Sequence, residues 1–216
     1  MATSPKLTLR SGTQLADPAK YRRIVGSLQY LAFTRPDISY AVNRLSQFMH
    51  QPSTDHWTAM KRVLRYLAGT LDHGILLKRG INRSLHAYTD TDWAGDSNDY
   101  VSTNGYIVYL GQHPISWSSK KQRSIAKSST EAEYQSVATT STELNWICSL
   151  LKELGVSFTT PPVIYCDNIG IKFSPGNSVV HVSTKDQLAD AFTKPVSRAA
   201  FTNFSTKIGV TKVPSS

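Results

Sequence analysis

The sequence contains little cysteine and no long apolar run. Its 216 residues include two cysteines, Cys148 and Cys166, and both lie in apolar stretches. Two such residues do not make a disulfide framework or a metal site, so we expect buried thiols in a reducing compartment. No apolar run approaches the roughly 20 residues of a membrane span, and the N-terminus lacks the charged-then-apolar pattern of a secretory signal. We therefore expect a soluble intracellular protein, cytoplasmic or nuclear, that does not enter a membrane.

Acidic residues are scarce, and the scarcity is uneven along the chain. The sequence has 24 Lys and Arg against 15 Asp and Glu, a formal net charge of +9. Residues 1–80 hold 12 basic and 4 acidic side chains, net +8, whereas residues 81–216 hold 12 and 11, net +1. The first part therefore has the charge of a segment that meets a polyanion. The alternative is that the basic excess serves only solubility.

Residues 18–80 carry three apolar stripes with the repeat of an amphipathic helix. We expect three helices joined by short loops, which is typical of compact helical packing. The two ends of the chain, residues 1–17 and 196–216, are polar and irregular, so we expect both to be flexible. The residues that define the first two stripes are Tyr21, Ile24, Val25, Leu28, Leu31, Ile38, Ala41, Val42, Leu45, Phe48 and Met49.

Residues 83–195 change to short β runs around one long helical stretch. The long helix returns the chain so that the strand at 162–166 lies beside the strand at 85–89, in parallel. This pattern predicts an α/β fold with a mixed sheet and a crossover helix. Strands are expected near 85–89, 105–110, 114–118 and 162–166, with the long helix from about Ser128 to Leu154 and a last short helix from Ser183 to Pro195.

Two carboxylates end the buried strands that we expect to be neighbours. Asp90 follows the strand at 85–89, and Asp167 follows the strand at 162–166. Parallel neighbours would bring these groups about 5 Å apart at one edge of the sheet. Clustered carboxylates repel unless a cation lies between them, and oxygen-only sites suit Mg²⁺. Taken singly, Asp167 is better explained as a helix N-cap and Asp90 as a turn residue.

The long helix offers a third carboxylate. At about 100° per residue, Glu133 lies about 40° from the core residue Val137, on the sheet-facing side, whereas Glu131 points to solvent. The alternative is a capping box of Thr130 with Glu133, although Ser128 with Glu131 makes an equally good box.

The last helix offers two further candidates. Asp186 and Asp190 are four residues apart, so they share one face of a regular helix. The alternative is structural: Asp186 caps the helix together with Ser183, and Asp190 pairs with Lys194. For this helix taken alone, we favour the structural alternative.

Six motifs, taken in order, resemble the ribonuclease H domain of copia-type retrotransposon Pol polyproteins. The helical part, with YRRIVGSLQYL at 21–31 and RPDI at 35–38, is similar to the segment that follows the palm of their reverse transcriptase. The resemblance covers roughly residues 18 to 201. The six motifs are YTDTDWAGD at 88–96, STNGY at 102–106, ISWSSKKQ at 115–122, SSTEAEY at 128–134, YCDN at 165–168 and DQLAD at 186–190.

This resemblance implies a ribonuclease H-like fold that cleaves RNA paired to DNA with two Mg²⁺ ions, or with Mn²⁺. It implies that the catalytic and metal-binding carboxylates are Asp90, Glu133, Asp167 and Asp186, with Asp186 preferred over Asp190. Specificity for an RNA–DNA hybrid would come from groove shape and 2′-hydroxyl contacts.

Four basic residues between the third strand and the long helix are candidates for phosphate contacts. The alternative is that they form a solvated turn. They are Lys120, Lys121, Arg123 and Lys127.

Three departures from the family bear on activity. The sequence begins after the palm and its polymerase aspartates, so we expect no polymerase activity. Tyr100 and Val101 stand where relatives usually carry a basic residue. The stretch 169–185 is much shorter than in relatives, which predicts a truncated last strand and helix and a less well supported catalytic site.

Two alternatives to an active nuclease therefore remain open. One is a catalytically impaired, nucleic-acid-binding remnant of the polyprotein. The other is a protein-interaction module on the three helices, whose partner would be the missing palm.

Overall fold

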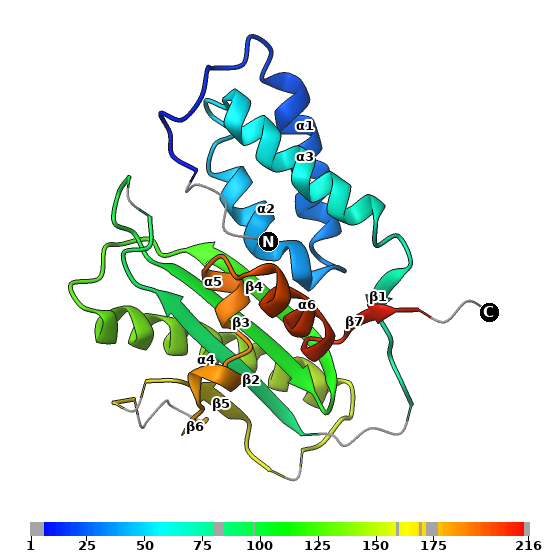
Figure 1. The fold of residues 1–216 in the computed structure, drawn as a ribbon. Coiled ribbons are helices and arrows are strands. Elements are labelled where there is room, and N and C mark those ends of the chain that lie inside the picture. The colour runs from blue at the N-terminus through cyan, green and yellow to red at the C-terminus, as the bar shows by residue number, and fades with distance from the viewer. Residues whose placement is uncertain are drawn as a thin grey trace. The chain divides into compact units, whose positions relative to one another are not determined.

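The computed structural model describes residues 7–79, 84–96, 98–158, 160–168, 170–171 and 177–213 of the chain. The chain forms two compact units (Figure 1). The first combines the residues up to Leu76 with those from Pro195 onward, and the second runs from Leu77 to Lys194. The expected junction at residues 80–83 lies outside the described residues, a few positions beyond this boundary.

The first unit is built on the three predicted helices. Their apolar stripes meet as expected: Tyr21, Val25 and Leu28 are buried against Met60 and Val63. No helix in the described ranges is long and apolar enough to cross a membrane. The elements of this unit are α1 (Ala19–Leu31), the 3₁₀ turn η1 (Pro36–Ile38), α2 (Ser39–Ser46), α3 (Thr54–Ala68), β1 (His73–Ile75), α6 (Arg198–Lys207) and β7 (Val210–Lys212).

The prediction of a flexible tail from residue 196 was wrong. The tail forms α6, which Ser197 caps by accepting a hydrogen bond from the Ala200 amide at 3.2 Å, and then β7. Strand β7 pairs antiparallel with β1, and Ile208 and Val210 are fully or almost fully buried. Local polarity misled the prediction, because a three-residue strand is stabilised by a partner more than a hundred residues earlier.

The described part of the N-terminal segment, residues 7–17, is also bound to the helical unit. Leu7 packs against the helical core, and the backbone at Gln14 bridges to Ser53. The His56 ring lies 3.0 Å from the Thr8 carbonyl oxygen. The expected flexibility therefore does not hold for these residues, and residues 1–6 lie outside the described ranges.

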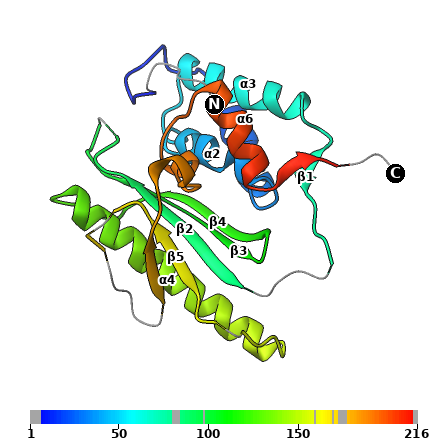
Figure 2. The same ribbon diagram turned by 60° about the horizontal axis from the view of Figure 1, so that its bottom comes forward.

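The second unit has the predicted mixed sheet. Its strand order is β4-β3-β2-β5-β6; β2, β3 and β4 are antiparallel neighbours, and β5 and β6 run parallel to β2. The crossover from β4 to β5 is α4, which lies along one face of the sheet (Figure 2). This is the arrangement expected of a ribonuclease H-like fold. The strands are β2 (Leu85–Asp92), β3 (Thr103–Leu110), β4 (His113–Lys121), β5 (Val163–Cys166) and β6 (Ser178–His181), and α4 spans Ser129–Glu153.

Alternation along β2 decides which side chains meet α4. Thr89 faces the helix, where its hydroxyl lies 2.8 Å from Ser136 Oγ and accepts a hydrogen bond from Thr140 at 2.9 Å. Leu85 and Ala87 point the same way, into a core shared with α4. Asp90, one position further along, therefore points to the opposite face of the sheet.

The last strand of the sheet is present but short, in keeping with the expected truncation. Strand β6 pairs with β5 over all four of its residues, from Ser178 to His181. In the connection before it, none of the described residues (167–168, 170–171 and 177) is helical. Ile171 fills the core, and Asn177 donates to Ser141 Oγ on α4 at 2.7 Å. These two contacts place Ile171 in the core and Asn177 against α4.

Candidate metal centre

The strand register brings Asp90 and Asp167 to the same place. Tyr88 on β2 is aligned with Tyr165 on β5. Two residues further along each chain lie Asp90 and Asp167, so both carboxylates leave the same face at the same end of the sheet. Strand β2 runs on to Asp92, which places Asp90 within the strand rather than in a turn. Asp90 is 3% exposed, so its carboxylate is almost fully withdrawn from water.

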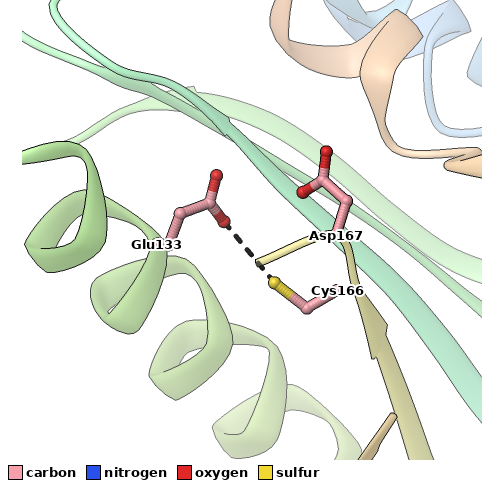
Figure 3. Close-up of side chains that lie close together, drawn as sticks. All are labelled: Glu133, Cys166 and Asp167. Atoms are coloured by element: carbon pink, nitrogen blue, oxygen red, sulfur yellow. Dashed lines mark hydrogen bonds between the residues drawn. The ribbon is translucent and has the colours of Figure 1, made fainter. Parts of the chain in front are cut away.

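Glu133 reaches this region from the first turns of α4. It is 9% exposed, on the sheet-facing side, as its helical position predicts. Figure 3 shows Glu133 extending toward the end of β5, where Cys166 Sγ donates a hydrogen bond to Glu133 Oε2 at 3.7 Å. The helix cap is made by Ser128, which accepts from the Glu131 amide at 3.1 Å. Glu133 is therefore not needed for capping and is available as a ligand.

The fourth carboxylate of the cluster is Asp190, whereas Asp186 is exposed to solvent. The expected helix from Ser183 to Pro195 is broken into η2 (Thr184–Asp186) and α5 (Asp190–Thr193). Gln187 between them is extended, with φ −70° and ψ 98°. This break removes the common face that a regular helix would give Asp186 and Asp190, so the preference for Asp186 does not hold in the geometry.

Gln187 is extended because its side chain is bound to the sheet. Its Nε2 donates to the Thr89 carbonyl at 2.9 Å, and its Oε1 accepts from the Ala189 amide at 3.1 Å. Helix α5 is held down further by Ser119, whose hydroxyl donates to the Phe192 carbonyl at 2.6 Å. These contacts fix the position of Asp190. The sequence reading missed Gln187, although it lies within the DQLAD motif.

The side chains of Asp90, Asp167 and Asp190 form one possible ligand set, and those of Glu133, Cys166 and Asp167 form a second. Within each set the potential ligand atoms all lie within 4.8 Å of one another. Asp167 belongs to both, so the two sets are adjacent. Four carboxylates grouped in this way give mainly oxygen donors, which suits Mg²⁺ and Mn²⁺. The donor set therefore fits a divalent cation.

Two residues of the α5 region contact the acidic cluster directly. The Thr193 hydroxyl donates a hydrogen bond to Asp90 Oδ2. Lys194 Nζ lies 2.8 Å from Asp190 Oδ1 and 3.9 Å from Asp90 Oδ2. An ion pair of Asp190 with Lys194 was the alternative to a metal-binding role that the sequence also allowed. It is present, but the same Asp190 also belongs to the cluster.

Burial and mutual repulsion raise the pKa of every carboxyl group in the cluster. Burial raises the pKa of Glu133 to about 8, and the neighbouring Asp90 and Asp167 add to the effect. The pKa values of Asp90, Asp167 and Asp190 are also raised, in each case chiefly by burial. A bound cation would oppose these shifts by favouring the ionised forms, as in other clustered carboxylate sites.

The four predicted phosphate-contacting residues differ in their surroundings. Lys120, Arg123 and Lys127 are exposed. Lys121 Nζ, by contrast, lies 2.5 Å from Asp96 Oδ2 and 2.7 Å from Asp99 Oδ2. Its charge is largely balanced within the protein, so it is a weaker candidate for a phosphate contact than the other three.

Comparison with known proteins gives relatives that match the whole chain, although no protein-family model matches it. The chain is 66% identical to the retrovirus-related Pol polyprotein from transposon RE2 of Arabidopsis thaliana, covering 100% of the chain and 17% of the relative. It is 64% identical to that from transposon RE1 of the same plant, covering 100% and 16%. The Pol polyprotein from transposon TNT 1-94 of Nicotiana tabacum is 41% identical over 76% of the chain and 12% of its own length.

Two features of these matches bear on the site. The chain spans about a sixth or less of the length of these relatives. The match to the first two extends over 242 residues, which exceeds the 216 residues of the chain by 26. The relatives therefore have residues in the matched span with no counterpart here, as the short connection before β6 would require.

Proposed function

The chain belongs to the Pol polyproteins of copia-type retrotransposons, and from this premise we propose that its second unit is a ribonuclease H. The proposed reaction is hydrolysis of the RNA strand of an RNA–DNA hybrid. The observation that carries the proposal is the meeting of four carboxylates, from β2, α4, the end of β5 and α5, at one end of the sheet. Buried carboxylates that repel one another destabilise a fold, so a cluster of this kind calls for a functional reason.

The residues divide naturally between two cation positions. Asp90, Asp167 and Asp190 would hold one ion, and Glu133 with Asp167 would hold the other, since Asp167 belongs to both groups. When bound, two Mg²⁺ ions, or Mn²⁺ in their place, supply activation of the attacking water and stabilisation of the leaving 3′ oxygen.

The protein's own contribution is to hold these carboxylates in place. Thr193 fixes one oxygen of Asp90 by its hydrogen bond, and Gln187 fixes the backbone that carries Asp190. Cys166 orients Glu133. Such supporting contacts matter because a site needs positioning to roughly half an ångström.

Phosphate contacts on the surface of the unit would position the hybrid. Lys120 lies at the end of β4, and Arg123 and Lys127 follow before α4. All three are exposed. Contacts of this kind carry no sequence information, and recognition of the hybrid would depend on groove shape and 2′-hydroxyl groups.

A second candidate function is a nucleic-acid-binding remnant with impaired catalysis. It is favoured by the 26 residues that the relatives have in addition, since a loss at the strand edge beside Asp167 would remove support from the site. The presence of β6 argues against a collapse of this edge.

Cleavage of a labelled RNA–DNA hybrid tests the first candidate against the second. The chain is incubated with the hybrid, with RNA duplex and with single-stranded RNA, in Mg²⁺, Mn²⁺ or EDTA. We expect cleavage of the RNA in the hybrid, dependent on the metal and lost in Asp90→Asn. Circular dichroism shows whether that variant is folded. Binding of the hybrid without cleavage by folded wild-type protein would refute the nuclease and support the remnant.

A further inference from the structure

Lys194 places a positive charge among the carboxylate oxygens that would bind a metal ion. Its ammonium group lies 2.8 Å from Asp190 Oδ1, a direct ion pair, and 3.9 Å from Asp90 Oδ2. Asp90 and Asp190 belong to the same potential ligand set. An ion bound between these two carboxylates would compete with the lysine for their negative charge.

The geometry of α5 holds Lys194 in this position. Lys194 follows the single turn of α5, and its amide donates to the Asp190 carbonyl at 3.1 Å. This places its side chain above Asp190 at the i, i+4 spacing of a helix. The lysine side chain keeps 39% of its surface exposed, against 4% for that of Asp90. It therefore lies at the rim of the cluster and has solvent into which it can swing.

The other side of the cluster is arranged differently. Glu133 and Asp167 share their surroundings with Cys166, whose sulfur donates to Glu133. A thiol that donates one weak hydrogen bond opposes a divalent cation far less than an ammonium group does. An ion at the first position therefore competes with an ammonium group, whereas an ion at the second position meets only a weak hydrogen-bond donor.

We propose that Lys194 is an intramolecular competitor for one of the two metal positions. An ion between Asp90 and Asp190 must displace the Lys194 ammonium, whereas an ion beside Glu133 and Asp167 need not. Lys194 is thus a positioning residue that sets the metal concentration at which the second ion binds. This inference rests on the proposed function only in taking the cluster as a metal centre.

Mn²⁺ binding to the full chain in the absence of nucleic acid tests the proposal. Isothermal titration calorimetry and the electron paramagnetic resonance signal of free Mn²⁺ give the number and affinity of the sites without any dependence on cleavage. We expect two classes of site in the wild type. Lys194→Met should tighten the weaker class by about tenfold and leave the tighter class within about twofold, because only one position is freed.

Matched variants separate displacement from a general effect of charge. Lys152→Met removes the same charge from an exposed position near the end of α4 and should change both classes by less than about twofold. Lys194→Arg keeps the charge and should retain the weaker affinity. Asp190→Asn should abolish the weaker class. Thermal unfolding in EDTA checks that each variant folds. Lys194→Gln provides a second neutral variant if Lys194→Met fails to fold.

The proposal would be overturned if the weaker-class affinity of Lys194→Met and Lys194→Gln equalled that of the wild type or of Lys152→Met. Weaker binding in the neutral variants would do the same, since it would make Lys194 a support of the site. The failure is distinct from that of the proposed function: hybrid cleavage with unaltered Mn²⁺ affinities would refute the role of Lys194 and leave the nuclease in place.

Discussion

Asp90 stands opposite Gly105 in the antiparallel pairing of β2 with β3. A Cβ atom at position 105 would lie 2.6 Å from Phe192 Cβ and 2.8 Å from Thr193 Cγ2. Glycine is therefore required there for a reason of packing, because α5 approaches the sheet closely at this point. The same approach brings Thr193 and Asp190 to Asp90.

Gly105→Ala should push α5 away from the sheet. Overpacking of this kind costs about 1–3 kcal/mol of stability, and displacement of α5 should weaken Mn²⁺ binding by Asp190. Chemical denaturation and Mn²⁺ titration measure the two effects. Gly26→Ala in α1 is the control, since nothing lies within 4 Å of its added Cβ; it should stabilise the protein by about 0.5–1 kcal/mol. Unaltered metal affinity in Gly105→Ala would contradict this account of α5.

Asp190 and Asp186 should respond differently to the same substitution. Asp190→Asn should lower the rate of hybrid cleavage by at least about 100-fold, equivalent to about 2.7 kcal/mol of transition-state stabilisation. Asp186→Asn, at an exposed position of η2, should lower it by less than about threefold. Single-turnover cleavage at saturating Mg²⁺ makes the comparison. If Asp186→Asn lowered the cleavage rate more than Asp190→Asn does, Asp186 would be the catalytic carboxylate, as the family resemblance implies.

The stability of the metal-free protein should depend on the ionisation of Glu133. The pKa of Glu133 is raised from 4.5 to about 8 on folding. The folded state therefore binds a proton that the unfolded state releases, and the contribution of Glu133 to stability falls as the pH rises from about 4.5 to about 8. The wild type in EDTA should lose more stability than Glu133→Gln between about pH 5 and pH 9.

Thermal unfolding of the two proteins across this pH range provides the measurement, and the difference between them removes the contribution of other groups. Added Mg²⁺ should reduce the difference, since a cation favours the ionised carboxylate. If the stability of the wild type and that of Glu133→Gln changed equally with pH in EDTA, folding would not raise the pKa of Glu133.

Lys121 should contribute to stability and Lys120 to nucleic-acid binding. Lys121→Ala removes the ion pair with Asp96, whose carboxylate is 3% exposed, and should cost about 1–3 kcal/mol. Lys120→Ala should leave stability within about 0.5 kcal/mol and reduce the salt dependence of hybrid binding by about one unit of slope. Denaturation and binding at several salt concentrations test both. If Lys121→Ala instead reduced the salt dependence of binding and left stability unchanged, Lys121 would contact a phosphate in the complex and not Asp96.

Much of the sheet and three of its carboxylates could be predicted from the sequence. Asp90 and Asp167 each follow an apolar run, and the crossover helix between the runs makes them parallel neighbours. Glu133 follows from the angular repeat of a long helix, which is insensitive to the rest of the fold. In these cases local pattern and tertiary structure agree.

The choice between Asp186 and Asp190 could not be made in this way. It depends on the extended backbone of Gln187, which follows from a hydrogen bond to Thr89, nearly a hundred residues earlier. The resemblance to a family pointed to the first aspartate of DQLAD, whereas the structure groups the second with Asp90 and Asp167. The pairing of β7 with β1 could not be predicted either, because the two strands are more than a hundred residues apart in the sequence.

Anomalous scattering from crystals soaked in Mn²⁺ tests most directly whether Asp90, Glu133, Asp167 and Asp190 form one metal centre. We predict anomalous peaks about 2.1 Å from oxygen atoms of these four carboxylates, with Asp167 contacting both ions and Lys194 displaced from Asp190. Crystals at saturating Mn²⁺ without a peak at this cluster, or with an ion held by Asp186 instead of Asp190, would contradict the claim.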